Sequence, residues 1–384
     1  MDKNNKNNYN KNNNDFNNND HIDKLFFKAF RNIVIRQEIL KHCRLFKENC
    51  KLEIFDKETL LNFKYRSYTS IVYYSINEPI DRFLIPESTT SLIFSNFNQP
   101  FAPNTIPESV KTIDLGIAYN HEIDNKSLPS LTKLIIRKKY KKPITKESLP
   151  SSITELTLEK TPKEIMIDKN SYPSSLRTII FGNCFNKRLE AGSIISNAPI
   201  STIIFGFDFD SYLEPNSIPP TVTTLIFGYH YDKPIFPRAL PSSLTSLTFG
   251  HRFNQRLLKG DLPDSLLSLT FSSCFNQTLS KAILPNNLTT LILGYYFDQP
   301  IRPNDLPQTL TLLKLGHNFN KQLTVGSIPN SVTSLTLGRY RHPIPPQVIP
   351  PSIKTLCFNK NIEDYLEPGS IPPSVTNLIK TYKS

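Results

Sequence analysis

Side chains able to bind a metal ion or to transfer a proton are thinly scattered along this chain. The seven histidines are His21, His42, His121, His230, His251, His317 and His342. His251 and His317 each follow a glycine at the end of a predicted strand, but they belong to units of the sequence that lie three turns apart. Metal ligands must converge within a few ångström. We therefore interpret the histidines as exposed loop residues and expect no metal site.

Three aspartates could suggest an acidic site, because Asp210, Asp232 and Asp298 each follow an aromatic residue. In other units the same position holds asparagine, whose short polar side chain satisfies backbone groups at a turn. A structural role therefore explains these aspartates better than acid–base chemistry. The chain also lacks the GxxxxGK[ST], GxGxxG, GxSxG and HExxH motifs. We expect a protein that is not an enzyme and that needs no cofactor.

The cysteines and the hydropathy pattern indicate a cytoplasmic or nuclear protein. Cys43, Cys50, Cys184, Cys274 and Cys357 are odd in number, widely spread and contain no CxxC pair, which argues against a disulfide framework or a zinc module. No apolar run approaches the roughly 18 residues of a membrane span. The polar beginning of the chain does not resemble a secretory signal. We expect no membrane partner.

Prolines divide most of the chain into units of about 22 residues. The chain has 31 prolines, and thirteen of them recur at spacings of 21 to 23 residues, apart from one double spacing. They are Pro86, Pro107, Pro129, Pro150, Pro173, Pro219, Pro241, Pro263, Pro285, Pro307, Pro329, Pro350 and Pro372. Such regular placement marks repeated turns rather than disorder.

Each unit also carries a version of the pattern LxxLxF, as in Leu244, Leu247 and Phe249. Fifteen such triplets can be traced, from Tyr68, Ile71 and Tyr73 to Val375, Leu378 and Lys380. The pattern LxxLxL followed by asparagine is the signature of leucine-rich repeats. The last two anchors alternate like a short strand with one buried face. We predict a mainly β, leucine-rich-repeat-like solenoid with a parallel sheet on its concave face, preceded by a short α-helical cap.

The chain divides into three zones. Residues 1–20 contain eleven asparagines and almost nothing apolar, so we expect a disordered Asn-rich tail. Residues 21–64 carry apolar residues near helical spacing over 24–47 and again in KETLLNF at 57–63, which predicts a short helical segment. This segment is interpreted either as a cap on the open end of the solenoid or as a partner-binding module. Residues 65–384 form the predicted solenoid.

After each strand comes an aromatic residue and an asparagine or aspartate, and then an apolar residue. Examples are Phe97-Asn98-Gln99-Pro100, Tyr231-Asp232-Lys233-Pro234-Ile235 and Phe297-Asp298-Gln299-Pro300-Ile301. This wording resembles the FNIP repeat family, a relative of the leucine-rich repeats, over about residues 66–380. The resemblance implies a protein-interaction scaffold without a common activity. Residues 137–145 and 159–167 depart from the pattern, and we expect local irregularity or specialisation there.

Residues between the buried anchors should form the concave sheet surface. They are mostly threonine, serine and isoleucine, with Asp114 among them. The β propensity of these residues explains most of the surface. Ile180, Ile204 and Ile226 are the exception, because three successive isoleucines would form an exposed apolar stripe. We predict that this isoleucine stripe contacts a protein partner.

Positive charge accumulates at one strand end and the loop that follows it. The chain carries a net charge of +12, and Arg137, Lys138, Lys139, Lys141 and Lys142 lie close together in its sequence. We treat this basic cluster as a second candidate partner-binding surface, for acidic protein or nucleic acid. The absence of a recognisable nucleic-acid-binding module argues against nucleic acid.

The function that these patterns favour is a non-catalytic protein–protein interaction scaffold. A substrate adaptor of a ubiquitin ligase is the first alternative, in which the N-terminal helices would dock a ligase core as an F-box does. The shortness of residues 24–63 and the lack of a clear Leu-Pro start count against it. A nucleic-acid-binding solenoid is the second alternative. The identity of any protein partner does not follow from the sequence.

Overall fold

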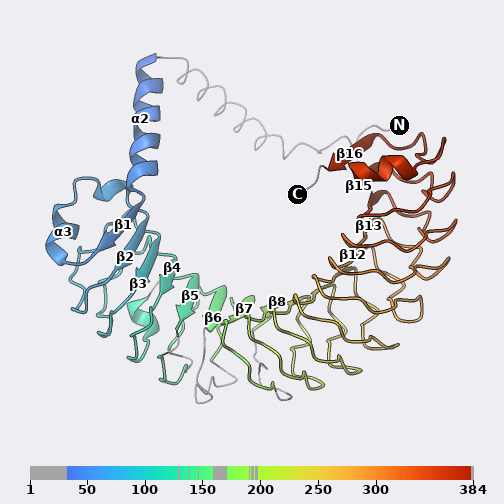
Figure 1. The fold of residues 1–384 in the computed structure, drawn as a ribbon. Coiled ribbons are helices and arrows are strands. Elements are labelled where there is room, and N and C mark those ends of the chain that lie inside the picture. Colours follow the sequence, from blue (N-terminus) through green and yellow to red (C-terminus); the bar gives the residue numbers. More distant parts are fainter. Residues whose placement is uncertain are drawn as a thin grey trace, which may run out of the picture.

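The computed structural model describes residues 33–381, except 129, 138, 146, 159–170, 190, 192–193 and 195–197. The predicted Asn-rich tail and the first part of the predicted helical segment lie outside the described residues. The described chain forms a curved solenoid, in which strands line the inner side of an arc and connecting segments form the outer side (Figure 1).

A single parallel sheet of sixteen strands runs through the described residues in strict chain order. Its strands are β1 (Lys51–Ile54), β2 (Ile71–Tyr74), β3 (Ser91–Phe94), β4 (Thr112–Asp114), β5 (Lys133–Ile136), β6 (Glu155–Leu158), β7 (Thr178–Phe181), β8 (Thr202–Ile204), β9 (Thr224–Ile226), β10 (Ser246–Thr248), β11 (Ser268–Thr270), β12 (Thr290–Ile292), β13 (Leu312–Lys314), β14 (Ser334–Thr336), β15 (Thr355–Asn359) and β16 (Asn377–Thr381). The predicted leucine-rich-repeat-like solenoid is thereby confirmed.

The LxxLxF pattern explains why these segments become strands. In the unit of β10, Leu244, Leu247 and Phe249 are all fully buried, whereas the residues between them face the concave side. Each leucine of the middle column pairs in register with the next, as Leu247 does with Leu269. One turn alone cannot cover its own apolar residues, so the core is continuous from unit to unit.

The first predicted triplet is wrong by one residue. Val72 and Tyr74 are the buried residues of β2, whereas Ile71 and Tyr73 were expected to point inward. The neighbouring strand fixes this register, because Val72 pairs with Leu92 and Tyr74 with Phe94. A slip of one residue moves every side chain of a strand to the other face.

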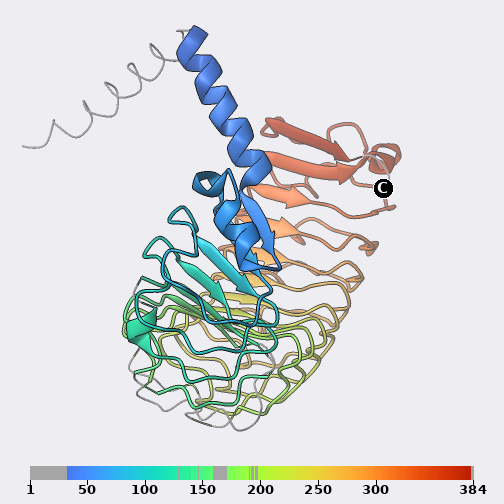
Figure 2. The same cartoon turned by 90° about the vertical axis from the view of Figure 1, so that its left-hand side faces the viewer.

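The N-terminal segment contributes to the sheet itself. Strand β1 pairs with β2, so the sheet begins inside residues 21–64 rather than after them. Helix α3 (Lys57–Asn62) starts at the N-cap Asp56, which accepts from Thr59 N at 2.6 Å, and it buries Leu60 against the core. Helix α2 (Ile33–Asn49) instead projects away from the end of the solenoid in both views (Figures 1 and 2).

Two ladders run along the solenoid behind the sheet. Aromatic rings stack from turn to turn, as Phe253 on Phe275 at 6.0 Å and Phe275 on Phe297 at 6.2 Å between centroids. Beside them, each asparagine or aspartate accepts a hydrogen bond from the backbone N–H of its counterpart one unit later. Asn276 Oδ1, for example, accepts from Asp298 N at 2.9 Å. These hydrogen bonds confirm the structural role predicted for the Asn/Asp column.

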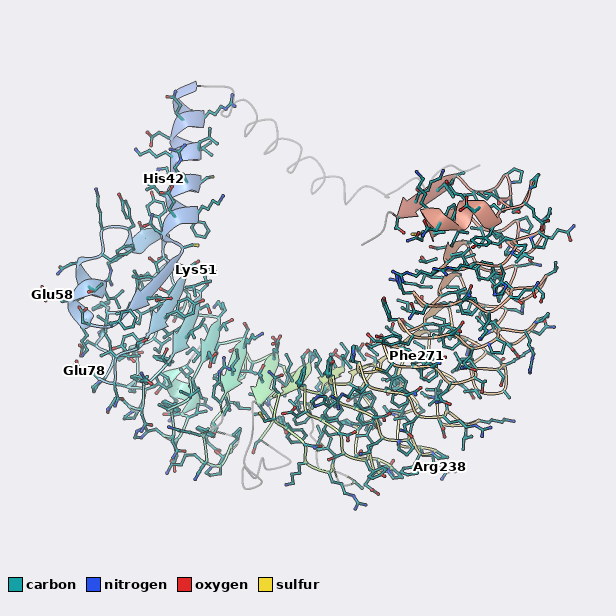
Figure 3. All side chains as sticks on the ribbon, viewed as in Figure 1. His42, Lys51, Glu58, Glu78, Arg238 and Phe271 are labelled. Atoms are coloured by element: carbon teal, nitrogen blue, oxygen red, sulfur yellow. The ribbon has the colours of Figure 1, made fainter. Side chains whose placement is uncertain are left out.

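The outer side consists of extended segments and tight turns. Within the described residues after α3, the only helical pieces are the short 3₁₀ helices η1 (Arg66–Tyr68), η2 (Asn125–Ser127) and η3 (Lys360–Tyr365). A left-handed backbone position recurs in the outer turns, where Asn216 and Asn304 have φ of 62° and 66°. Arg238 adopts the same conformation with φ of 68°, and it lies on the outer side of the arc, away from Phe271 near the inner side (Figure 3).

Candidate functional site

The predicted isoleucine stripe exists on the concave face. Ile180 pairs with Ile204, and Ile204 pairs with Ile226, on the neighbouring strands β7, β8 and β9. All three side chains are half-buried, because they face away from the core but pack against one another along the sheet. Their position makes a short apolar strip across three turns.

The predicted basic cluster is only partly available to a partner. Arg137 donates to the buried carboxylate of Asp114, with Nε 2.8 Å from Oδ1. Lys139 and Lys141 are exposed and Lys142 is half-buried, whereas Lys138 lies outside the described residues. The cluster therefore offers fewer free charges than its sequence suggests, since its arginine is engaged within the protein.

The prediction for Asp114 in the concave column is wrong. Its side chain was expected to be exposed on the sheet surface, but the residue is only 4% exposed. Besides the guanidinium of Arg137, its Oδ1 accepts from Gly116 N at 3.0 Å. Burying a carboxylate without partners is costly, and these donors satisfy it. On the next two strands Lys133 pairs with Glu155, so this part of the concave face is charged but internally compensated.

The unit containing Arg137 was also expected to be irregular, because Lys141 replaces the asparagine. Its described part is regular. Tyr140 stacks on Tyr119 at 6.3 Å, and the N–H of Lys141 still donates to Asn120 Oδ1 at 2.8 Å. The only effect of lysine is that its side chain, which has no acceptor, cannot receive a hydrogen bond from the backbone N–H of the next unit. The other irregular unit, 159–167, lies outside the described residues.

Aromatic side chains form a further surface that the sequence analysis missed. They follow the strand-end glycines and stand at the edge where the strands end, which we call the aromatic rim: Phe207, Tyr229, His251, Tyr295 and His317. The rings of Phe207 and Tyr229 stack at 4.6 Å, and those of Tyr229 and His251 at 4.3 Å. Phe207 is 46% exposed and Tyr229 is 37% exposed.

The sequence does contain a signal for the aromatic rim, because aromatic residues recur at the position that follows the strand-end glycines. These glycines allow close approach of the turns. A Cβ on Gly228 would meet the carbonyl oxygen of Gly206 at 1.6 Å, so a side chain cannot be fitted there without moving the backbone. Because the glycine position can hold no side chain, the ring–ring contacts of the rim are made by the residue that directly follows each glycine.

The rim meets the concave face at a hollow near the C-terminal turns. This basic hollow has a volume of about 580 Å³ and is lined from β11 to β16. Lys314, His317 and Arg339 line it together with Tyr295, and no acidic residue is among its lining residues. His317 stacks on Tyr295 at 4.5 Å. Burial, and secondly the nearby Arg339 charge, lower the pKa of His317 below its usual value.

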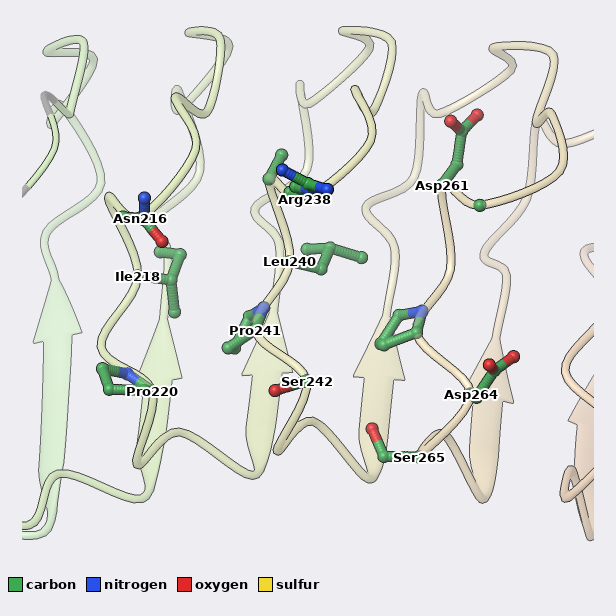
Figure 4. Close-up of a pocket in the computed structure, with 13 residues that line it drawn as sticks. Asn216, Ile218, Pro220, Arg238, Leu240, Pro241, Ser242, Asp261, Asp264 and Ser265 are labelled. Carbon is green, nitrogen blue, oxygen red and sulfur yellow. The ribbon is translucent and has the colours of Figure 1, made fainter.

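A second hollow, of about 650 Å³, lies on the segments that lead from the outer turns back to the strands (Figure 4). Its walls are the proline corners Pro220, Pro241 and Pro263, with Arg238 and Asp261 at one end. The Asp261 carboxylate accepts from Leu258 N at 2.7 Å and so caps its own turn. Burial raises the pKa of Asp261. A structural role therefore accounts for the carboxylate of Asp261.

Metal-ligating side chains do not converge in the part of the chain that the structure describes, where no group of three His, Cys, Asp or Glu could hold an ion. His251 and His317 stack on tyrosines of the rim instead. Among the helices of residues 33–381, none has the length and apolarity that crossing a bilayer would require.

Comparison with known proteins agrees with the repeat pattern. The FNIP repeat matches eight times, over residues 76–118, 97–139, 119–161, 185–230, 231–274, 275–318, 297–340 and 340–379. The chain belongs to the FNIP repeat family. In terms of the FNIP repeat, the aromatic residue and the asparagine that name it form the two ladders behind the sheet.

Two relatives extend this assignment. An FNIP repeat-containing protein of Dictyostelium discoideum is 28% identical over 196 residues, which are 50% of this chain and 33% of the relative. The crystal structure of CroV588, described as a novel circular leucine-rich-repeat protein, aligns with a TM-score of 0.58 and 29% identity over 82% of this chain and 53% of that one. This FNIP-repeat chain therefore spans about a third and about half of the lengths of these two proteins.

Proposed function

We propose that this FNIP-repeat chain is a non-catalytic scaffold that binds a protein partner along its concave face and aromatic rim. The observation that carries the proposal is the continuity of the isoleucine stripe with the rim. In the units of β8 and β9, Ile204 and Ile226 are followed three residues later by the exposed rings of Phe207 and Tyr229. Contiguous exposed apolar surface marks interaction sites, and aromatic residues are enriched at the centre of interfaces.

The rim also has the rigidity that an interface favours. Because Phe207 and Tyr229 stack on each other within 11° of parallel, their rings are already ordered before a partner arrives. Binding therefore costs less side-chain conformational entropy at these two rings. Strands β8 to β11 carry only Thr, Ser, Ile and Leu and supply an uncharged surface next to these rings.

The test compares partners recovered by affinity purification and mass spectrometry from cells expressing the full chain or Phe207→Ser/Tyr229→Ser. The matched control is Tyr212→Ser/Phe236→Ser, because these rings come from the same two units, stack at 5.8 Å and are 44% and 46% exposed. We expect a set of proteins that the rim variant loses and the control variant keeps. Equal recovery with both variants would overturn the proposal.

A second candidate role concerns α2, which we propose as a docking helix rather than a cap. Leu40 and Phe46 are both 50% exposed on this helix, and its described side chains are almost all exposed. The hydroxyl of Tyr68 bonds Nδ1 of His42, which ties the helix to η1 while most of its length stays clear of the solenoid. Helix α2 has few tertiary contacts and so draws little stability from packing, and a partner that covers its exposed apolar residues would stabilise it.

An adaptor of a ubiquitin ligase would use α2 in this way, with the solenoid holding the substrate. Proximity labelling of the full chain tests this role, with Leu40→Ser/Phe46→Ser as the variant and Arg44→Ala/Lys47→Ala on the same helix as the control. We expect ligase-core subunits among the labelled proteins with the control and not with the variant. The adaptor role fails if ligase-core subunits are labelled by neither. Nucleic-acid binding has less support, since Arg137 is engaged by Asp114.

A further inference from the structure

The basic hollow, lined from β11 to β16, brings two cations and a histidine together without an acidic residue. Lys314 projects from β13 at a position flanked in register by Ile292 and Thr336. Arg339 follows Gly338 one unit later, and both side chains are exposed where they line the hollow. We propose that the basic hollow binds a phosphorylated side chain of an extended protein segment. This inference rests on the proposed function, since the hollow continues the same concave face.

The first argument is uncompensated charge. On β5 and in the loop that follows it, two cations have carboxylate partners, because Arg137 pairs with Asp114 and Lys133 with Glu155. Among the described residues neither Lys314 nor Arg339 has an ion pair, and the lining of the hollow contains no aspartate or glutamate. Lys314 and Arg339 line the same hollow, so an anion bound there would interact favourably with both charges.

The second argument is an unsatisfied polar atom. Nε2 of His317 is buried and has no hydrogen-bond partner within the described structure. A buried polar group without a partner is costly. His317 stacks on Tyr295 at the wall of the hollow, which Lys314 and Arg339 also line. A small rotation of the His317 ring would let Nε2 donate to a phosphate oxygen held by these two cations.

The third argument selects phosphate over a carboxylate. A phosphorylated side chain carries a charge of about −1.5 to −2 and three acceptor oxygens, which matches two cations and one imidazole. A single carboxylate would leave one cation uncompensated. Arginine in particular binds phosphate through two parallel hydrogen bonds. The volume of about 580 Å³ lies within the range of sites that hold small ligands or single side chains.

The test uses the purified full chain and fluorescence anisotropy with pools of degenerate peptides. Each pool has a fixed central residue: phosphoserine, phosphotyrosine, serine, tyrosine or glutamate. We expect at least one phosphorylated pool to bind about tenfold or more tightly than its unphosphorylated counterpart and than the glutamate pool, and inorganic phosphate to compete. Equal binding of the phosphorylated and unphosphorylated pools would overturn the inference. Equal binding of the phosphorylated and glutamate pools would also overturn it, in favour of a merely acidic partner.

The variant that locates the site is Lys314→Thr/Arg339→Gln. Threonine occupies the neighbouring position of the same column at Thr336, so the sheet accommodates it. The control is Lys281→Thr/Arg302→Gln, which removes the same charge from exposed residues outside the hollow. We expect the variant to lose the preference for phosphorylated peptide and the control to retain it. Retention by both variants would place phosphate binding elsewhere and refute the assignment.

Failure of this inference is distinguishable from failure of the scaffold proposal. If phosphatase treatment of the lysate leaves partner recovery unchanged while Phe207→Ser/Tyr229→Ser abolishes it, the scaffold stands and the phosphate site falls. If the phosphorylated pools discriminate on the purified chain but the rim variant keeps every partner, the phosphate site stands and the rim proposal falls.

Discussion

Truncation of Leu269 tests the core of the solenoid. The side chain is fully buried on β11 and lies in register between Leu247 and Leu291 of the neighbouring strands. Leu269→Ala removes three buried carbon groups, each of which contributes about 0.8 kcal/mol. The cavity left between two rigid neighbours adds to this loss, because the surrounding turns relax only in part. We expect the free energy of unfolding to fall by about 2.5–5 kcal/mol.

The same strand region offers a matched control. Leu267 is the same residue type two positions earlier, but it is 43% exposed on the other face. Leu267→Ala should cost no more than about 0.5 kcal/mol, as surface substitutions usually do. Chemical denaturation followed by circular dichroism measures both variants against the parent chain. A larger loss for Leu267→Ala than for Leu269→Ala would refute the assigned register.

Hydrogen exchange adds a spatial readout to this experiment. In a repeat protein each turn contacts only its neighbours, so destabilisation should be local. We expect faster amide exchange in β10, β11 and β12 of Leu269→Ala and unchanged exchange in β3 and β4. Uniformly faster exchange along the whole sheet would show that the solenoid unfolds as one cooperative unit, which contradicts the nearest-neighbour reasoning.

Three further outcomes follow from the ladders, the outer turns and the rim. Asn276→Ala removes the acceptor of the Asp298 N–H at 2.9 Å; stability should fall by about 1–3 kcal/mol because a backbone donor loses its partner, and an unchanged denaturant midpoint would contradict this. Arg238→Asn should stabilise the chain by roughly 1 kcal/mol, because asparagine tolerates the left-handed backbone better than arginine; a lower unfolding temperature would count against it. Burial, and secondly Arg339, lower the pKa of His317 below 6.5, so the folded state binds fewer protons than the unfolded chain and stability should be lost as pH falls below 6.5. Unfolding midpoints at several pH values measure this, and His317→Gln should weaken the dependence; an unaltered profile would refute the assignment.

Periodic features of the chain were predictable because each unit repeats the same evidence. The prolines, the LxxLxF anchors and the aromatic–asparagine pairs fix one another's register, so β3 to β15 fall where the pattern places them. The first strands lack this support. In IVYY every residue of β2 is apolar or aromatic, so alternation cannot show which face is buried, and only pairing with Leu92 decides it. Strand β1 precedes the first regular proline and was missed.

The surface was harder to predict, because exposure depends on partners from other units. From the sequence, Arg137 and Asp114 were expected to be free charges. In the structure, Arg137 Nε lies 2.8 Å from Asp114 Oδ1 across neighbouring turns. The rim residues Phe207 and Tyr229 were also missed. Their separation in the sequence hides the stacking at 4.6 Å that makes one continuous surface of them.

The asparagine ladder gives the molecule a direction. Each Asn or Asp side chain of the ladder accepts a hydrogen bond from the backbone N–H of the unit that follows it, so a unit within the ladder depends on the side chain of its predecessor and presents an acceptor to its successor. In the described chain the ladder has two stretches. The first begins with Asn77, which accepts from Asn98 N, and ends at Lys141. The second begins with Asn186, which accepts from Asp210 N, and ends at Arg341. A gene duplication that inserts one whole unit between Asn254 and Asn276 preserves the pattern of such bonds, whereas a partial insertion separates Asn276 N from the acceptor of Asn254. The array therefore tolerates the insertion of whole units by recombination. A unit with lysine or arginine at the Asn/Asp position ends the ladder, because its side chain offers no acceptor to the next unit.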